Sequence, residues 1–185
     1  TLIQRLKKYT FRVLLGLILL LLGSAIVLSL PFVQTKIGHY VTQMLNDDFG
    51  TDINVEQVSF SVFGGVKLKT VLIKDHHQDT LIYVNRIKTN ILDIRKMFNG
   101  DLLFGDIRLD GVVFNLKIYK DEDDTNINKF IALFDSDTPS SGKKFLMEAT
   151  NAYLTNTTFR VINENLKIPK SVDFTRLDAS LSKFK

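Results

Sequence analysis

The sequence predicts a mainly antiparallel β protein with one transmembrane helix at its N-terminus and a few short helices. Three observations support this fold class. A long uncharged apolar run lies near the start of the chain, the residues from 51 onward alternate repeatedly between apolar and polar, and short segments show helical spacing. With 185 residues, 45% of them hydrophobic, the chain is long enough to bury a core.

The apolar run VLLGLILLLLGSAIVLSLPFV occupies residues 13–33 and contains no charge. About 20 helical residues cross the ~30 Å hydrocarbon core of a bilayer, so we predict a transmembrane anchor at 13–33 after a basic flank at 1–12. A cleaved signal peptide is the alternative, but its apolar region normally has only about 7–15 residues. Basic residues gather on the N-terminal side, which predicts a cytoplasmic N-terminus in the bacterial inner membrane: Arg5, Lys7, Lys8 and Arg12.

Residues 34–50 change to helical periodicity. Their apolar positions, together with Val33, recur every three or four residues: Ile37, Tyr40, Val41, Met44 and Leu45. An amphipathic helix at this place can lie on the membrane surface, but its polar face is not rich in lysine as such helices usually are. We therefore expect it to cap the first strands.

The first β-hairpin is predicted from strands at 53–62 and 66–74. Val58, Phe60 and Val62 alternate with polar residues, and Val66 and Leu68 continue the pattern. A three-residue loop at 63–65 would place Val62 opposite Val66 and Phe60 opposite Leu68. The apolar positions then change from even to odd numbers at Val71 and Ile73. A β-bulge near Lys69 and Thr70 would keep them on the same face and place Val58 opposite Val71.

The second hairpin is predicted over residues 102–119. Asp110 and Gly111 are a dipeptide typical of a two-residue turn. That turn pairs Leu109 with Val112 and Ile107 with Phe114, and a bulge at Gly105 would pair Phe104 with Leu116 and Leu102 with Ile118. Both hairpins are thus apolar on one face.

The remaining elements are predicted more briefly. Further strands are expected at 81–92, 145–152, 158–163 and 172–183, and short helices at 91–100 and at 126–134, the latter capped by Asp124 or Thr125. The final LDASLSKFK alternates like a strand that continues, and the chain begins with threonine. We therefore expect a fragment of a longer protein, with residues 51–185 as the start of an extended β region.

Composition excludes several classes of function. The net charge of +4 arises before Val13, and the rest of the chain has as many basic as acidic residues, so we expect no nucleic-acid partner. His76 and His77 lie in KDHHQD between two strands, where adjacent side chains point to opposite faces, and we interpret them as a solvated turn. The acidic run at 121–124 lacks the glycine and distal glutamate of an EF-hand. With no cysteine, GxSxG, phosphate loop or HExxH, the sequence predicts no enzyme, no metal and no cofactor.

Taken in order, these parts resemble the N-terminal module of the AsmA and TamB superfamily. The resemblance runs from about residue 10 to 120 and comprises the anchor, PFVQTKIGHYVTQMLNDDFGTDINVEQVSFS, VKLKTVLIKD and LDIRKMFNGDLLFGDIRLDGVVFNL. The family's strand patterns are matched, with one-residue offsets, at Ile53, Val55, Val58, Ile107, Leu109, Asp110, Gly111 and Phe114. The proline frequent after the family's anchor is absent from Gln34, Thr35 and Lys36.

The resemblance implies a protein that spans the periplasm and whose sheet curls into an open, elongated, taco-like β-groove. It implies phospholipid as cargo, carried as in bridge-like lipid transfer proteins, and an outer-membrane β-barrel of the BamA or TamA type as partner at the far end of a longer chain. The alternative function is an assembly factor for outer-membrane proteins or autotransporters that works with such a barrel, and a third is a tether without cargo.

Two interpretations of the apolar faces stay open at this point. Either the hairpins and the helix pack into an ordinary closed core, or part of the surface contacts acyl chains. With the resemblance we favour the second. The residues expected to line the groove are Val58, Phe60, Val62, Val66, Leu68, Val71, Ile73, Ile107, Leu109, Val112, Phe114, Leu116 and Ile118.

Overall fold

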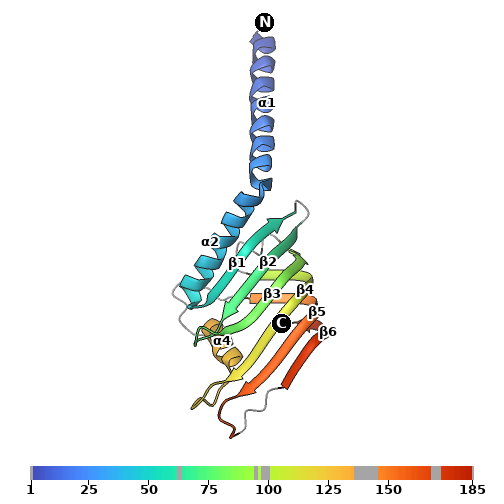
Figure 1. Ribbon diagram of the computed structural model, residues 1–185. Coiled ribbons are helices and arrows are strands. Elements are labelled where there is room, and N and C mark those ends of the chain that lie inside the picture. Colours follow the sequence, from blue (N-terminus) through green and yellow to red (C-terminus); the bar gives the residue numbers. More distant parts are fainter. Residues whose placement is uncertain are drawn as a thin grey trace.

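The computed structural model describes residues 2–61, 64–93, 96, 101–135, 146–167 and 172–184. Half of the chain lies in strands and 35% in helices, so the protein is mainly β, as predicted. A long helix projects away from one open sheet (Figure 1). The elements are α1 (Leu2–Ser29), α2 (Pro31–Phe49), β1 (Asp52–Phe60), β2 (Gly65–Lys74), β3 (Thr80–Asn90), β4 (Asp101–Ile118), α4 (Asn126–Asp135), β5 (Leu146–Asn163) and β6 (Val172–Phe184).

A break at Leu30 separates α1 from α2. The residue before a proline avoids the helical conformation, and Leu30 accordingly has φ −69° and ψ 129°. Pro31 then begins α2, three residues before the predicted start at 34. Within α1, an 18-residue window of the span Lys7–Ser29 has a mean hydropathy of 2.6, and none of the residues of this span is buried. This helix is long and apolar enough to span a membrane.

The described strands form a single sheet in chain order, from β1 at one edge to β6 at the other. Neighbouring strands are antiparallel except β4 and β5, which are parallel. A parallel pair requires the chain to return along the length of the strand before it pairs. α4 lies in the connection that makes this return. The mainly antiparallel sheet that the sequence predicted is confirmed, with β4 and β5 as its parallel pair.

The turn predicted at Asp110 and Gly111 is wrong. β4 runs through both residues as one strand of 18 residues, so the hairpin pairs predicted across the turn lie along one strand. Leu109 and Val112 pair instead with Ile87 and Val84 of β3. Gly111 does adopt the positive φ that favours glycine, 67°, but uses it for a bend within the strand.

The first predicted hairpin exists as β1 and β2, but its register differs by two residues. Phe60 pairs with Val66 in place of Leu68. The backbone N–H of Ser61 donates to the carbonyl of Gly65 at 2.7 Å, which sets the new register at the end of the strands. Because the shift is an even number of residues, the apolar side chains still share one face.

A line of left-handed backbone crosses the sheet where the apolar alternation changes phase. Thr70, Gly111 and Asn156 have φ values of 52°, 67° and 51° and lie at the same level on β2, β4 and β5; we call this line the crease. Across it, residues that face the same way are three positions apart, as with Val55 and Val58.

The crease replaces the bulge that the sequence predicted in the second strand. Neighbouring strands change phase together, so the pairing of β1 with β2 keeps one register on both sides of Thr70. Val71 consequently pairs with Val55 and not with Val58. A bulge in one strand alone would have shifted that register.

Other elements follow the sequence more closely. The helix predicted at 126–134 is confirmed as α4, and the hydroxyl of Thr125 caps it by accepting the N–H of Asn128 at 3.2 Å. The two strands predicted at 145–152 and 158–163 are one strand, β5, which passes through the crease at Asn156. The helix predicted at 91–100 lies mostly outside the described residues.

α2 covers the outer edge of β1 with side chains that replace a strand partner. The side-chain amide of Gln34 both donates to and accepts from the backbone of Phe60 at 3.1 Å. The amide of Asn46 does the same with Ile53 at 2.9 Å. Unpaired edges recruit other strands, so α2 closes this edge, and the expectation that it caps the first strands is confirmed.

The contact between α2 and β1 depends on a glycine. A Cβ on Gly38 would overlap Cγ2 of Val58 and lie 2.8 Å from its Cβ. We expect Gly38→Ala to destabilise the packing of α2 on β1 by about 1–3 kcal/mol, as overpacking does, measured by thermal unfolding of the protein in detergent micelles. Gly16→Ala is the control, because a Cβ there meets nothing within 4 Å. Equal unfolding midpoints for the two variants would contradict the expected close contact.

Candidate functional site

One face of the sheet carries apolar side chains in rows that run across the strands. Directly paired residues have their side chains on the same face, so pairing partners define each row. On one side of the crease the rows are Val55, Val71, Val84 and Val112, then Ile53, Ile73, Ile82, Phe114, Phe159 and Phe174. On the other side they are Val58, Leu68, Ile87, Leu109, Leu154 and Ala179, then Phe60 with Val66, and Ile107 with Ala152 and Leu181. We call this surface the apolar face.

The structure brings the predicted lining residues together on this face. Strand alternation adds Leu116 and Ile118, which follow Phe114 at every second position of β4. Val62 lies outside the described residues. Sequence reasoning missed the apolar residues of β3, β5 and β6, although each strand shows the same alternation: Ile82, Val84, Ile87, Leu154, Phe159, Phe174, Leu177 and Leu181.

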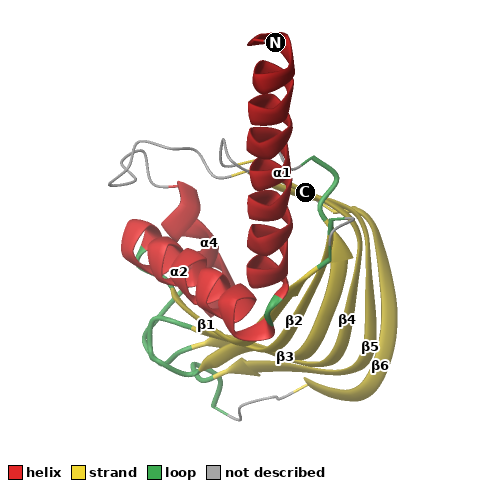
Figure 2. Ribbon diagram, turned by 90° about the horizontal axis from the view of Figure 1, so that it is seen from above, coloured by secondary structure: helices red, strands yellow, loops and turns green. Residues whose placement is uncertain are grey.

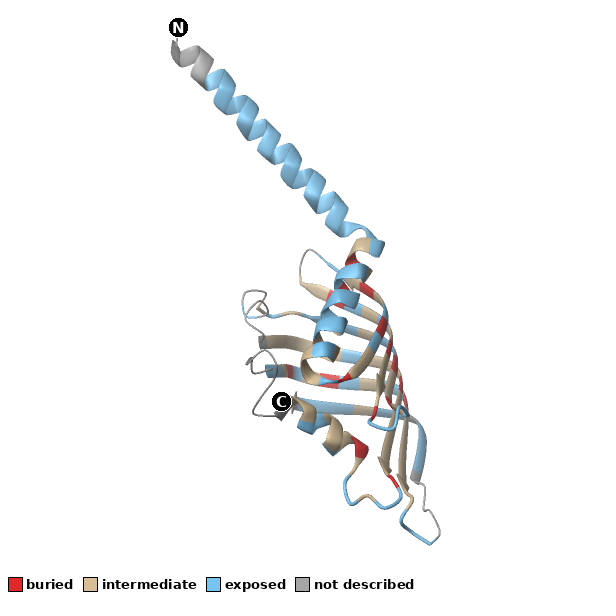
Figure 3. Ribbon diagram, turned by 90° about the vertical axis from the view of Figure 1, so that its left-hand side faces the viewer, coloured by how far each residue is buried: buried red, intermediate tan, exposed pale blue. Residues whose placement is uncertain are grey.

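Exposure increases across the apolar face toward β6. Val55 and Val71 are 5% and 6% exposed, whereas Leu177 and Leu181 on β6 are 42% and 48% exposed. Buried residues recur on successive strands near the crease (Figure 3). Burial of one such side chain contributes about 1.5–3 kcal/mol, so the part on β1 to β4 is a stable core. The part on β6 is open apolar surface.

The apolar face lies on the inner side of the curved sheet. The sheet curves around the side on which α2 and α4 lie (Figure 2). Val58 marks the same side, because its side chain is the one that packs against Gly38 of α2. The polar side chains that alternate with the apolar rows therefore lie on the outer side.

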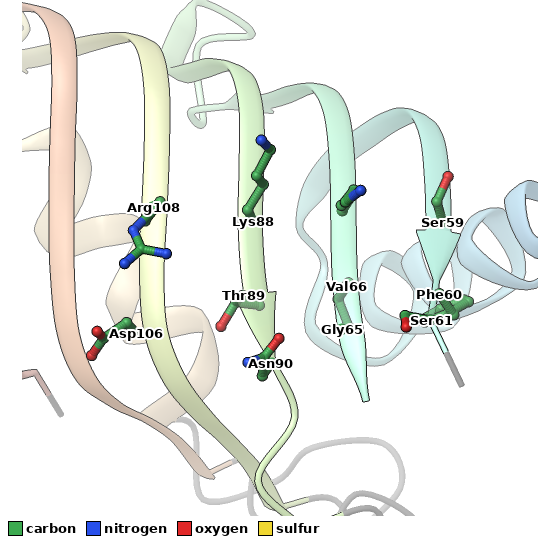
Figure 4. Close-up of a pocket in the computed structure, with 11 residues that line it drawn as sticks. Ser59, Phe60, Ser61, Gly65, Val66, Lys88, Thr89, Asn90, Asp106 and Arg108 are labelled. Carbon is green, nitrogen blue, oxygen red and sulfur yellow. The ribbon is translucent and has the colours of Figure 1, made fainter. Parts of the chain in front are cut away.

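The outer side carries a row of basic residues. Lys67, Lys88 and Arg108 are direct partners on β2, β3 and β4, and they line a depression of about 540 Å³ together with Ser59 and Asp106. Figure 4 shows Lys88 and Arg108 on neighbouring strands, and Ser59 on β1 beyond β2. This depression suits an anionic group. Its basic side chains alternate with the apolar rows and point to the other side, although Phe60 and Val66 of the apolar face also line it.

A buried carboxylate that the sequence did not single out ties the turn between β2 and β3 to the end of β4. Asp75 is 4% exposed. It accepts hydrogen bonds from the hydroxyl of Tyr119 at 2.6 Å, the amide of Asn126 at 3.0 Å, and the N–H groups of His77 and Asp79 at 3.0 and 3.1 Å. We call these residues the Asp75 cluster. Tyr119 and Asn126 lie 44 and 51 positions after Asp75 in the chain, so no local sequence pattern reveals the cluster.

Hydrogen bonds set the charge of the Asp75 cluster. Burial alone would raise the pKa of Asp75, but the donors outweigh it, and the pKa lies below its usual value of 3.8. Burial and the hydrogen bonds that its hydroxyl donates to the carboxylates of Asp75 and Asp79 raise the pKa of Tyr119. Neither group is therefore suited to exchange a proton near neutral pH, and the cluster serves as a structural joint.

His76 and His77 lie in an exposed turn, as predicted, but their rings lie only 4.5 Å apart and do not point to opposite faces. Both belong to the turn between β2 and β3, where side chains do not alternate between faces as on a strand. Their Nε2 atoms contact the carboxylate of Glu122, from the acidic run, at 3.0 and 2.9 Å. Two sequence features that were interpreted separately thus meet in one place.

The basic residues predicted to orient the protein lie on the first half of α1, where Lys7, Lys8 and Arg12 are exposed. No protein-family model matches the chain, and no curated protein matches its sequence.

Proposed function

We propose that the protein is a TamB-like lipid carrier, anchored in the bacterial inner membrane by α1, with its sheet in the periplasm and its N-terminus in the cytoplasm. Phospholipid is held with its acyl chains on the apolar face and moves along it toward the outer membrane. The observation that carries this proposal is the set of apolar rows that ends on exposed β6 residues: Phe174, Leu177 and Leu181.

The apolar face supplies a sufficient driving force without any covalent chemistry. Each methylene sheltered from water is worth about 0.8 kcal/mol. A surface that shelters about a dozen methylenes therefore offsets roughly 10 kcal/mol of the cost of drawing a lipid from the bilayer. The rows continue from strand to strand, and the polar residues Thr89 and Thr157 that stand in two of them carry no charge.

The link between α1 and the sheet supports entry at one particular end. α2 follows α1 after a single residue, and Gln34 in its first turn is bonded to the backbone of Phe60. The end of the apolar face that holds Phe60 and Val66 is therefore the one nearest α1. A lipid that leaves the bilayer beside α1 meets this end first.

Photocrosslinking from neighbouring residues of β6 tests the proposal. Phe174 is on the apolar face, and the next residue, Thr175, points to the other side. A photoreactive amino acid at 174 should capture phospholipid in cells, and one at 175 should not. Equal lipid capture from both positions would defeat the assignment of the apolar face.

A second function is favoured by the edge of β6. β6 pairs only with β5 in the described sheet, and no described helix covers it as α2 covers β1. An assembly factor for outer-membrane proteins would add a client strand there by β-augmentation and pass it to a BamA-type barrel. Both positions 174 and 175 would then crosslink to nascent outer-membrane proteins. Crosslinks to neither lipid nor protein would instead indicate a tether.

A further inference from the structure

The turn between β2 and β3 and the segment after β4 bring together three side chains that are typical metal ligands. They are His76, His77 and Glu122, and their ligand atoms lie within 4.8 Å of one another. Nε2 of His76 is 3.0 Å from Oε2 of Glu122, and Nε2 of His77 is 2.9 Å from Oε1. Two imidazoles and one carboxylate are a ligand set that proteins use for Zn²⁺, with water in the fourth position.

The spacing of these atoms suits a tetrahedral ion. Ligands about 2.0–2.1 Å from zinc at tetrahedral angles are about 3.3 Å apart. The observed nitrogen-to-oxygen distances of 2.9–3.1 Å need only a small opening of the cluster. The two histidine side chains are 30% and 46% exposed, so an ion can reach them from solvent.

The surroundings hold the ligands in place before any ion binds. The ring of His77 stacks on Tyr119 with centroids 3.8 Å apart, and the ring of His76 meets the same tyrosine edge-on at 5.4 Å. The hydroxyl of Tyr119 is bonded to Asp75, which also holds the backbone of His77. Supporting contacts of this kind orient metal ligands and strengthen binding.

The third ligand is fixed in a similar way. The N–H of Glu122 donates to the carbonyl of Tyr119 at 3.1 Å, and its carbonyl accepts from the side chain of Asn165 at 2.7 Å. Its carboxylate also pairs with Lys129, whose Nζ lies 2.8 Å from Oε2. This lysine competes with a bound cation for the same oxygen.

We propose that His76, His77 and Glu122 form a binding site for a divalent transition-metal ion of the Zn²⁺ class, which joins the β2–β3 turn to the segment between β4 and α4. The ion bridges parts of the chain 45 and 46 positions apart, at the opposite end of β2 from Phe60. The site is independent of lipid carriage and of the apolar face.

Calorimetric titration of the whole chain in detergent micelles with ZnCl₂ tests the site. We expect saturable binding of one ion per chain. Exchange of both ligands, His76→Gln with His77→Gln, keeps a hydrogen-bond donor beside Glu122. It should weaken binding by more than about 100-fold, which exceeds the loss typical of a supporting residue. His39→Ala is the matched control, because His39 is the remaining histidine and lies on α2.

Lys129→Met separates a metal site from a simple cluster of charges. Removal of the competing cation should tighten Zn²⁺ binding by about tenfold, and Co²⁺ bound to this variant should give the intense visible absorption of a tetrahedral ion. Circular dichroism shows whether each variant is folded. Absence of saturable binding, equal binding by the double glutamine variant, or loss of binding in His39→Ala would each overturn the proposal.

Discussion

Aspartate in place of Leu181 is expected to lower the phospholipid carried by the protein by roughly 100-fold. Leu181 lies on the apolar face and is 48% exposed, so a charge there does not have to be buried for the protein to fold. An acyl chain in contact with it would meet a carboxylate, at a cost of about 2.5–3.5 kcal/mol on scales for charged residues in hydrocarbon. That cost corresponds to about two decades in the equilibrium constant. Mass spectrometry of lipid that copurifies with the membrane-extracted protein measures the change.

The neighbouring residue supplies a control of the same charge. Ser180 is exposed on β6. It pairs with Tyr153, which pairs with Arg108 on the outer side of the sheet. Ser180→Asp should leave the bound lipid unchanged, because its carboxylate points to water. If the two aspartate variants carried the same amount of lipid, the apolar face would not be the binding surface.

Alanine in place of Asp75 should cause the largest loss of stability, about 3–5 kcal/mol. The substitution removes the acceptor of two backbone N–H groups of the turn. It also removes one of the two acceptors of the Tyr119 hydroxyl and of the Asn126 amide, which keep Asp79 and the carbonyl of Asn115 respectively. A buried polar group that loses its partner costs about 1–3 kcal/mol, and the groups next to solvent recover part of this from water. Urea denaturation followed by circular dichroism measures the free energy of unfolding.

Asp79 lies in the same turn and serves as the comparison. Its side chain is 58% exposed, accepts a hydrogen bond from the hydroxyl of Tyr119 and forms an ion pair with Lys117. Exposed pairs contribute about 0–1 kcal/mol, so Asp79→Ala should be much milder than Asp75→Ala. Equal losses would mean that the turn, and not the buried carboxylate, joins the strands.

The alternation of apolar residues was enough to predict which side chains share a face. Phe60, Val66 and Leu68 lie on the apolar face even though their register is shifted by two, because an even shift keeps each residue on its side. The uncharged run before Pro31 likewise predicted α1. These features depend on periodicity, which is a local property of the sequence.

Features that depend on distant contacts were not predicted. Gly111 suits a positive φ equally well in a two-residue turn and in a crease, so only the pairing of β4 with β3 and β5 decides between them. The meeting of His76 with Glu122 requires the β2–β3 turn and the segment after β4, which lie at the same end of the antiparallel strands β3 and β4, to fold toward each other. No pattern within either segment contains that information.

The crease also limits how this sheet can change during evolution. Thr70 on β2 and Gly111 on β4 bend at the same level, and the strands between and beside them change phase with them. Loss of one residue from β2 alone would turn half of its side chains to the wrong side relative to both neighbours. An insertion or deletion of one residue in a single strand is therefore selected against, because the neighbouring strands do not change with it. Exchange of one apolar residue for another keeps the side chain on its face and is tolerated. We expect descendants of this chain to keep its curvature while the identity of nearly every residue along it drifts.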